Sequence, residues 1–545
     1  MNESCFDPSR RRRRQGSAPV RARAFACVLA LAAIGATTLA GAPPVWAQRA
    51  PHAEQPSTPA AGGAPAHGGG QSGQSARQLP ADSTTDQAVE LPGRTLRFKA
   101  TAGSIPLNNG EDGSLLAEVA YVAYVMDGDA KSSSTRPVTF VFNGGPGAAS
   151  AYLDLGAVGP WRLPFGHLAV SSPPALSPNA ETWLDFTDLV FIDPPGTGYS
   201  RIAGSSDEAR RHFWSVDGDT EALAVFIRKW IEQSGRQGSV KFIAGESYGG
   251  FRAPKVARKL QNQGVGIRGL VLISPVIDFA SFGVRRQAPM SWVTHLPSMT
   301  AAALDAKGQY SRDALREVER YAAGDYLLDL LKGERDAAAT ARISGRVAEF
   351  TGLDPALVKR LGGRIDVATF RRELHRSERL VGSMYDPNIT AYDPNPTAAD
   401  SHYSDPVLDD TRAPITTAMT DLYQHVLNWR VDRPYELLNR QVSQRWEWGH
   451  GRMAAEAFDD LRNELANDPL LRVLVAHGAN DLVTPYFADQ LLLNQLPVMG
   501  SPDRVKLAVY AGGHMFYNRD ASRKSLHDDA AAMFRAAMNP AQTGE

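Results

Sequence analysis

Residues 241–260 read KFIAGESYGGFRAPKVARKL, and this stretch decides the fold. The apolar run FIA is typical of a short buried strand, and APKVARKL has the spacing of a helix. Between them, GESYG at 245–249 matches G-x-S-x-G, in which a tight turn between strand and helix holds a serine hydroxyl above the sheet. Its glycines stand where a Cβ would clash. A serine in an ordinary glycine-rich turn is the alternative, but the strand before it and the helix after it favour Ser247 as a nucleophile.

Strand-like runs of the same kind recur along the chain, and most end in a glycine-rich loop. They are PVTFVFNGGPG (137–147), DLVFIDPPGTGYS (188–200), GLVLISPVID (269–278) and LRVLVAHGAND (471–481). Amphipathic stretches such as VDGDTEALAVFIRKWIEQ lie between them. Short apolar strands that alternate with helices predict an α/β domain whose mostly parallel sheet is covered on both faces. In such a sheet the functional site gathers at the carboxyl ends of the strands, where these loops fall.

A serine hydroxyl needs a base to take its proton. His514, in AVYAGGHMFYNR, follows a short strand-like run and two glycines, and Asp481, in HGANDLVTP, also follows a strand. The order Ser247, Asp481, His514 is that of the catalytic triad of the α/β-hydrolase fold, so we expect that fold, with Asp481 orienting the imidazole. His477 is a rival base, but it precedes the aspartate and breaks the order.

An acyl-transfer site also needs two backbone N–H groups that bind the developing oxyanion. We expect one from Tyr248, which follows the nucleophile, and the other from Gly145 in the NGGPG loop. A phosphate-binding loop is the alternative interpretation of NGGPG. However, both the lysine of G-x-x-x-x-G-K-[ST] and the spacing of G-x-G-x-x-G are missing. The chain has no H-E-x-x-H motif and no C-x-x-C pair, so we expect no metal and no cofactor.

Residues from about 282 to 450 interrupt the alternation, and we expect them to form a helical cap inserted over the sheet. The stretch 311–350 is amphipathic, whereas YDPNITAYDPNPTAADSHYSDP is a loop rich in Asp and Pro. Calcium is an alternative function for that loop, but its acids lack regular ligand spacing. They are Asp386, Asp393, Asp400 and Asp405.

The N-terminus has the pattern of an export signal. A basic region at 10–14 precedes an apolar run from about 24 to 42, and PVWAQ supplies a cleavage site after Ala47. An uncleaved membrane anchor is the alternative, but Gly and Pro interrupt the run before that site. We expect a signal peptide at 1–47 and a periplasmic or secreted protein with no stable membrane insertion after cleavage. A disordered linker rich in Pro, Gly and Ala follows at 48–90, and the catalytic domain spans 91–545.

Charge and cysteine content narrow the function further. The formal net charge is −1, and residues 1–47 hold seven Arg against two acids (+5), so the remainder carries −6. No basic patch remains outside the leader, which argues against a nucleic-acid partner. Cys5 and Cys27 both lie in the leader, so we expect a mature protein without disulfides.

Several motifs together resemble the serine carboxypeptidase family. FNGGPGAAS, LGAVGP, FIDPPGTGYS, AGESYGG, HGANDLVTP and AGGHMFY stand in that family's order, over about residues 91–280 and 465–520. The resemblance implies that Asn143, Gly144 and Glu246 bind the terminal carboxylate of a peptide substrate. A glutamate that faces a carboxylate must be protonated to donate a hydrogen bond, so such a site prefers acidic pH.

The chain departs from the family's pattern at three positions. Ala157 stands where the family usually has a second glutamate, Val141 where it has a tryptophan, and Ala148 where it has a cysteine. The resemblance therefore implies an exported serine carboxypeptidase that releases C-terminal amino acids through an acyl-enzyme on Ser247, but these changes put carboxylate recognition in question. An esterase, acyltransferase or aminopeptidase acting on another peptide or small acyl substrate is the second hypothesis. A non-catalytic binding protein is the third.

Overall fold

The computed structural model describes residues 78–539, apart from short segments at 129–133, 166–168, 172, 174, 205–206, 283–286, 400 and 450–452. The predicted signal peptide and most of the predicted linker lie outside the described residues. Among the helices that are described, none is long and apolar enough to cross a membrane.

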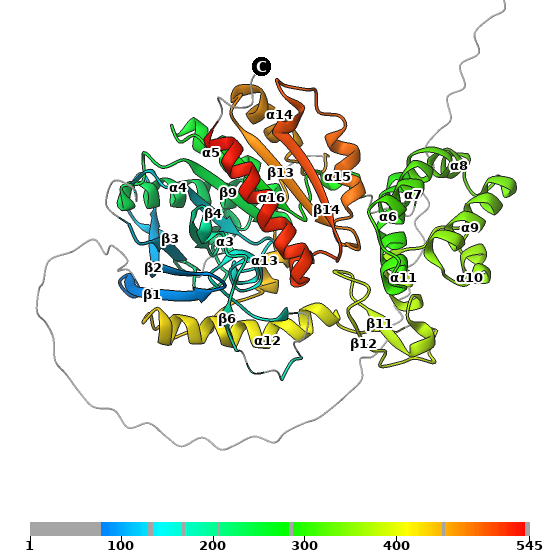
Figure 1. The fold of residues 1–545 in the computed structure, drawn as a ribbon, viewed down its shortest axis with the longest axis horizontal. Helices are drawn as coiled ribbons and strands as arrows, with labels where there is room; N and C mark the ends of the chain where they lie inside the picture. Colours follow the sequence, from blue (N-terminus) through cyan, green and yellow to red (C-terminus); the bar gives the residue numbers. More distant parts are fainter. Residues whose placement is uncertain are drawn as a thin grey trace, which may run out of the picture. The chain divides into compact units, whose positions relative to one another are not determined.

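Across the described residues, the central sheet has ten strands, nine of them in the order β1-β2-β3-β7-β4-β9-β10-β13-β14, while β8 pairs with β3 (Figure 1). The six strands from β7 to β14 in this order are parallel, whereas the pairs β1–β2, β2–β3 and β3–β7 are antiparallel. Their bounds are β1 (Ser83–Leu91), β2 (Arg94–Asn108), β3 (Leu115–Met126), β4 (Val138–Phe142), β7 (Asp188–Ile192), β8 (Arg201–Ile202), β9 (Lys241–Glu246), β10 (Gly269–Ile273), β13 (Arg472–Gly478) and β14 (Val505–Tyr510). The predicted mostly parallel sheet is thus confirmed.

The boundary predicted at residue 90 is wrong, because the sheet begins earlier. β1 pairs antiparallel with β2 from Ser83 onward, across a turn at Gly93, whose φ is +77°. Leu79 is also buried. STTDQAVEL carries few apolar residues because β1 is an edge strand whose alternate side chains are exposed. The strand therefore has the composition of a linker.

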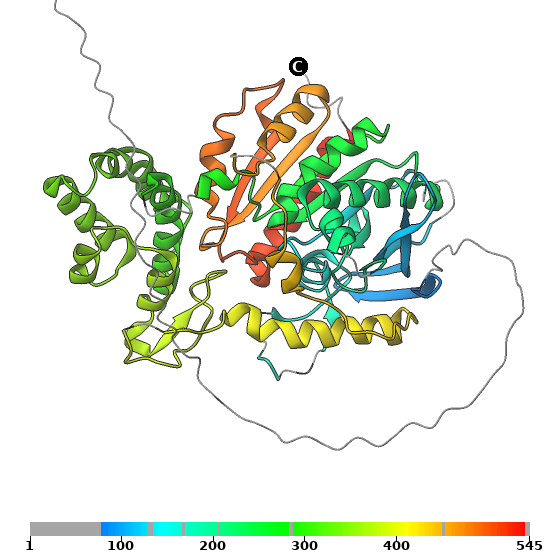
Figure 2. The ribbon, with the colours of Figure 1, turned by 180° about the vertical axis from the view of Figure 1, so that it is seen from behind.

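Helices cover both faces of the sheet, as the sequence predicted (Figures 1 and 2). Consecutive strand residues point to opposite faces, so Phe140 and Val141 lie in different cores. One core packs against α4 (Val216–Ser234), α5 (Tyr248–Asn262) and α14 (Phe458–Asn467). The other packs against α12 (Pro406–Asp421) and α16 (Asp520–Met538). Shorter helices are α2 (Ala151–Leu153), α3 (Asp207–Phe213), α13 (Arg440–Gln444) and α15 (Tyr486–Leu493).

The insertion predicted at about 282–450 is not one separate cap. A third core joins its first helices to α15. Beyond them, α12 and residues such as Trp429 and Trp446 belong to the two cores of the sheet. The helices of the third core are α6 (Pro289–Ala306), α7 (Arg316–Tyr321), α8 (Leu327–Lys332), α9 (Ala337–Thr351), α10 (Pro355–Arg360) and α11 (Val367–Glu373).

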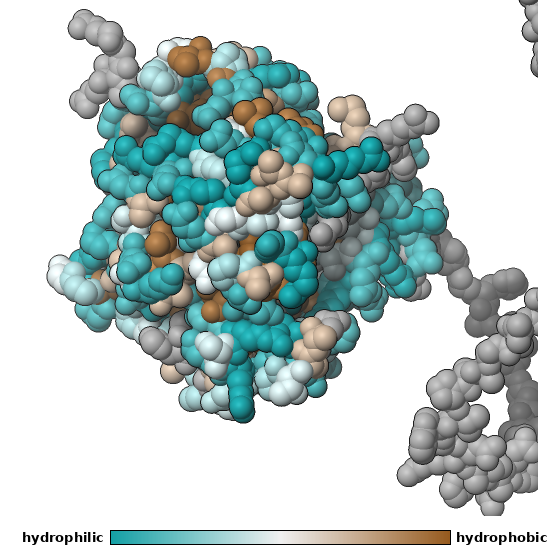
Figure 3. Space-filling view, turned by 90° about the vertical axis from the view of Figure 1, so that its right-hand side faces the viewer, coloured by the Kyte–Doolittle hydropathy of each residue, from teal (hydrophilic) through white to brown (hydrophobic). Residues whose placement is uncertain are grey.

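The face turned to the viewer in Figure 3 is mostly hydrophilic, with apolar residues in small groups.

A small hairpin follows α11 and brings the insertion to the sheet. It consists of β11 (Leu380–Gly382) and β12 (Thr390–Tyr392). In its loop, the carbonyl oxygen of Tyr385 accepts a hydrogen bond from the His514 N–H at 2.6 Å. A second two-stranded sheet is made of β5 (Trp161–Arg162) and β6 (Ser177–Pro178).

Candidate active site

Ser247 sits in a strained turn between β9 and α5. Its φ is +59° and its ψ −124°, a backbone conformation that costs about 1–3 kcal/mol for a residue with a side chain. The turn leaves no room beside it: a Cβ on Gly245 would lie 2.2 Å from the carbonyl oxygen of Gly249. The Ser247 N–H is held by the Ile273 carbonyl of β10 at 2.9 Å. The glycines of the predicted motif are therefore steric requirements of the turn.

The predicted acid and base lie together in loops after neighbouring strands. Asp481 follows β13 and His514 follows β14, and His514 Nδ1 lies 2.7 Å from Asp481 Oδ2. Both side chains are buried. Burial lowers the pKa of His514, but the Asp481 carboxylate and then Glu246 outweigh it, so that this pKa lies above its ordinary value.

Thr484 is a partner of the Asp–His pair that the sequence reasoning missed. Its hydroxyl donates to Asp481 Oδ2 at 2.7 Å and lies 3.1 Å from His514 Nδ1. Its N–H, with that of Val483, donates to Asp481 Oδ1. The spacing Asp-x-x-Thr in HGANDLVTP was the available signal, since a carboxylate followed by such donors forms a local turn.

The rival base His477 has a different partner. Its Nε2 lies 2.9 Å from Asp489 Oδ2 on α15, and both side chains are fully buried. His477 is thus hydrogen-bonded to Asp489, and it is His514 that the structure pairs with Asp481.

The NGGPG loop packs directly against the serine turn. In the sheet, Phe142 is paired with Gly245, so the residues that follow both strands meet. A Cβ on Gly144 would lie 2.5 Å from the Tyr248 nitrogen and 2.6 Å from the Glu246 carbonyl oxygen. Tyr248 is the first residue of α5, so its N–H has no acceptor within the helix. Gly145 has a φ of +103°, which a residue with a side chain rarely adopts.

We predict that Gly144→Ala lowers kcat/KM on a simple ester by about 10²-fold or more, the size of a lost oxyanion contact. The added methyl group would meet backbone atoms that cannot rotate away, and it would push the loop from Tyr248. Gly266→Ala is the matched control, because its Cβ would meet nothing within 4 Å. Equal activity of the two variants would contradict this account.

Glu246 is a buried acid next to the nucleophile, and only 2% of its surface is exposed. Its Oε2 accepts a hydrogen bond from Asn143 Nδ2. The Tyr517 hydroxyl lies 3.0 Å from both carboxyl oxygens. Burial raises the pKa of Glu246 to about 7, although His514, Tyr517 and Asn143 each lower it. The structure thus brings Asn143, Gly144 and Glu246 together, and it adds Tyr517, which the sequence reasoning missed.

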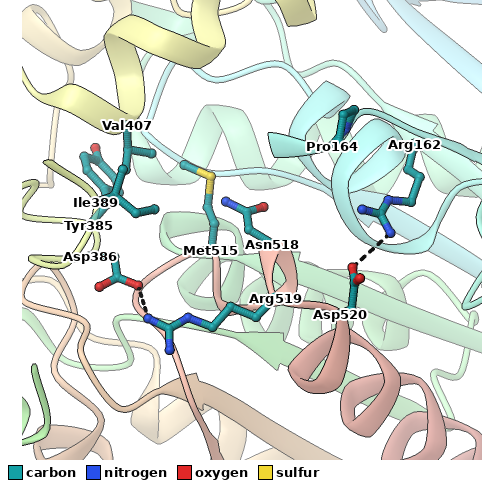
Figure 4. A pocket seen from close by; sticks show the side chains of 10 residues that line it. All are labelled: Arg162, Pro164, Tyr385, Asp386, Ile389, Val407, Met515, Asn518, Arg519 and Asp520. Atoms are coloured by element: carbon teal, nitrogen blue, oxygen red, sulfur yellow. Dashed lines mark hydrogen bonds and ion pairs between the residues drawn. The ribbon is translucent and has the colours of Figure 1, made fainter. Parts of the chain in front are cut away.

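A cavity of about 360 Å³ is lined in part by the segment that directly follows His514 (Figure 4). Met515, the next residue, lines it, as does Tyr385, whose ring centroid lies 5.3 Å from that of the imidazole. Tyr385, Ile389 and Val407 form one wall, and Arg162 lies on the other side. The charged residues around it are paired: Arg519 with Asp386, and Arg162 with Asp520.

The acids of the Asp- and Pro-rich loop have other partners than a metal. Asp386 pairs with Arg519, Asp393 with Arg372 and Asp405 with Arg371, while Asp400 lies outside the described residues. Among the residues described, no group of three or more His, Cys, Asp or Glu is arranged to hold a metal ion.

A buried ion pair fixes the helix of the nucleophile to its surroundings. Arg252 of α5 donates through Nε and Nη2 to both carboxyl oxygens of Asp219 in α4, at 2.6 and 3.2 Å. Its Nη1 donates to the Asn143 carbonyl oxygen at 2.7 Å. The guanidinium also lies over the Tyr248 ring, 4.9 Å from its centroid. One side chain therefore connects α4, α5 and the NGGPG loop.

Comparison with known proteins agrees with this geometry. Residues 92–304 match the profile of the serine carboxypeptidase family. Pheromone-processing carboxypeptidase kex1 of Neosartorya fischeri is 33% identical over 156 residues, which are 26% of this chain and 23% of that protein. Serine carboxypeptidase-like 28 of Arabidopsis thaliana is 29% identical over 209 residues, 35% of this chain and 41% of that protein. The chain thus aligns with less than half the length of these curated relatives.

The fold has a counterpart among solved structures. The crystal structure of Kex1Δp, a prohormone-processing carboxypeptidase from Saccharomyces cerevisiae, superimposes with a TM-score of 0.52. The alignment covers 80% of this chain and 91% of that chain, at 16% sequence identity. The likeness shows the fold, which is that of the α/β-hydrolases. The profile match over residues 92–304, the two relatives and this shared fold all relate the chain to the serine carboxypeptidase family.

Proposed function

We propose that this protein is a serine-type carboxypeptidase that releases C-terminal amino acids from peptides. The observation that carries the proposal is the buried Glu246 carboxyl beside Ser247, hydrogen-bonded to Asn143. A carboxyl group whose pKa is near 7 is neutral at mildly acidic pH. It then has a proton to donate to the terminal carboxylate of a peptide, where an ionised one would repel it.

In the proposed reaction, Ser247 Oγ attacks the last peptide carbonyl while His514 takes its proton. Asp481 holds the imidazole by its Nδ1–H, and the amides of Gly145 and Tyr248 bind the oxyanion. The C–N bond then breaks as His514 returns the proton to the leaving amino acid. Water attacks the acyl-enzyme by the same route and releases the shortened peptide and free Ser247. The cavity lined by Met515 supplies space for the leaving residue.

The test compares an N-blocked dipeptide with a free C-terminus, the same dipeptide amidated, and a simple ester, from pH 5 to 9. At pH 6 we expect the free acid to be cleaved about 10-fold or more faster than the amide, the value of a hydrogen bond to a charged group. Asn143→Ala should reduce that preference, whereas Glu246→Gln, whose neutral amide still donates a hydrogen bond, should keep much of it at pH 6. Both variants should leave ester turnover largely intact. Equal cleavage of acid and amide, or turnover of esters alone, would favour the esterase, acyltransferase or aminopeptidase hypothesis instead.

The pH profiles should separate the two titrating groups. Every substrate should react faster as pH rises through the pKa of His514, because the base must be neutral. Only the free acid should then react more slowly above about pH 7, as Glu246 ionises. Glutamine is neutral at all pH values, so Glu246→Gln should lose this alkaline decline.

We also propose that the protein is exported, on the basic and apolar pattern of its first 47 residues.

A further inference from the structure

The Glu246 carboxyl is held by groups from two loops, and their geometry favours one of its two oxygens as the site of the proton. Asn143 Oδ1 accepts the Leu153 N–H at 3.0 Å, so the amide must present its Nδ2 to Glu246. Glu246 Oε2 is therefore an acceptor, which favours Oε1 as the oxygen that carries the proton of the neutral acid. The hydroxyl of Tyr517 lies 3.0 Å from that oxygen and from Oε2.

Tyr517 is fully buried and comes from the short helical segment Phe516–Asn518, three residues after His514. It packs against the turn Asp154–Val158, which contains Ala157: a Cβ on Gly156 would lie 3.0 Å from Tyr517 Cε2. The phenol thus lies between that turn and Glu246. At position 157 of the turn, alanine stands in place of the second glutamate that is usual in the family. Burial and the Glu246 carboxyl raise the pKa of Tyr517 well above its ordinary value, so the hydroxyl remains a donor.

We propose that Tyr517 is a positioning residue for substrate recognition: its hydroxyl orients the Glu246 carboxyl and sets the pH range in which that acid is neutral. This inference rests on the proposed function. A phenol that donates to a carboxylate favours the ionised form, so Tyr517 opposes the effect of burial. The other titratable groups around Glu246 are His514, Asp481, Tyr152 and Tyr385. Of these, His514 favours the ionised form and Asp481 disfavours it.

The test is Tyr517→Phe, which removes one oxygen and keeps the ring against Gly156. Without that donor, the ionised form of Glu246 is less stable, so its pKa should rise. The alkaline decline of free-acid cleavage should then move up by about one pH unit, while the ester profile stays unchanged. Tyr510→Phe is the matched control, since its hydroxyl donates to Asp529 at 2.7 Å, outside the candidate site. Within Glu246→Gln, adding Tyr517→Phe should not change the pH profile.

A second readout does not depend on turnover. In the Ser247→Ala chain, the infrared band of the neutral Glu246 carboxyl is identified by its loss in Glu246→Gln, which separates it from other buried acids. Its titration midpoint should rise by about one pH unit in Tyr517→Phe and not in Tyr510→Phe. If the wild type prefers free acids but Tyr517→Phe leaves both midpoints unchanged, the inference is wrong and the proposed function stands. A parallel loss of ester and free-acid turnover at every pH would also overturn it. A wild type without preference for free acids overturns both.

Discussion

Ser247→Ala should lower kcat on a simple ester by about 10⁴-fold or more, with little change in the free energy of unfolding. The side chain stands on a turn whose glycines and strained backbone serve to expose it, and a methyl group in its place leaves that turn intact. His514→Ala should cost a similar factor. Because the two residues act in one proton transfer, the double variant should be scarcely slower than either single variant.

Ser274 provides the matched control for this prediction. It is a buried serine at the end of the neighbouring strand β10, also with a positive φ, and its hydroxyl donates to the His514 carbonyl oxygen at 2.7 Å. Ser274→Ala removes one neutral hydrogen bond, so its loss should stay within about 10-fold. A fluorophosphonate probe should label the wild type and Ser274→Ala, but not Ser247→Ala. Labelling of Ser247→Ala, or wild-type turnover by it, would show that Ser247 is not the nucleophile.

The sequence could predict the parts of this molecule in which a local pattern has a single structural solution. The middle of strand β9, Phe242 to Ala244, is buried on both faces of the sheet and is therefore apolar. The turn after it needs Gly245 because a Cβ would strike the Gly249 carbonyl. Parallel strands with their carboxyl ends at one edge bring Asp481 and His514 together, so their order in the chain was sufficient to pair them.

The edge strand β1 could not be predicted, because the information lies in its partner. Its exposed alternate residues give STTDQAVEL the composition of a flexible segment, and only the register with β2 makes it a strand. Similarly, nothing in the sequence around α12 distinguishes a cap helix from one that packs on the core of the sheet.

Two contacts that depend on the packing of different elements were also beyond the sequence. Tyr517 and Glu246 are 271 residues apart, and Arg252 and Asp219 are 33 apart on different helices. A local pattern shows that α5 has an arginine in its first turns, but it does not show that this side chain is buried. Both contacts depend on how elements pack, and both concern residues that hold the site in place.

Arg252→Met should lower the free energy of unfolding by about 3–5 kcal/mol, the cost of breaking a buried ion pair from one side. Only 1% of the Arg252 side chain and 2% of that of Asp219 are exposed. Methionine fills most of the volume but leaves the Asp219 carboxylate buried without a counter-charge, and burial already raises the pKa of that group. Urea unfolding followed by tryptophan fluorescence measures the change.

A surface ion pair between the same two helices distinguishes the effect of burial on stability from the effect of removing a charge. Lys259 of α5 lies 3.2 Å from Glu221 of α4, and these side chains are 29% and 46% exposed. Lys259→Met removes the same charge and should change stability by no more than about 1 kcal/mol, because water screens the pair. The double variant Asp219→Asn/Arg252→Met should recover much of the loss, since no uncompensated charge remains. Two results would contradict this explanation: equal destabilisation by Arg252→Met and Lys259→Met, or a double variant that is less stable than Arg252→Met. Either would show that the uncompensated Asp219 carboxylate does not cause the loss of stability in Arg252→Met. The contact of Arg252 with the Asn143 carbonyl and its packing over Tyr248 would then account for its effect.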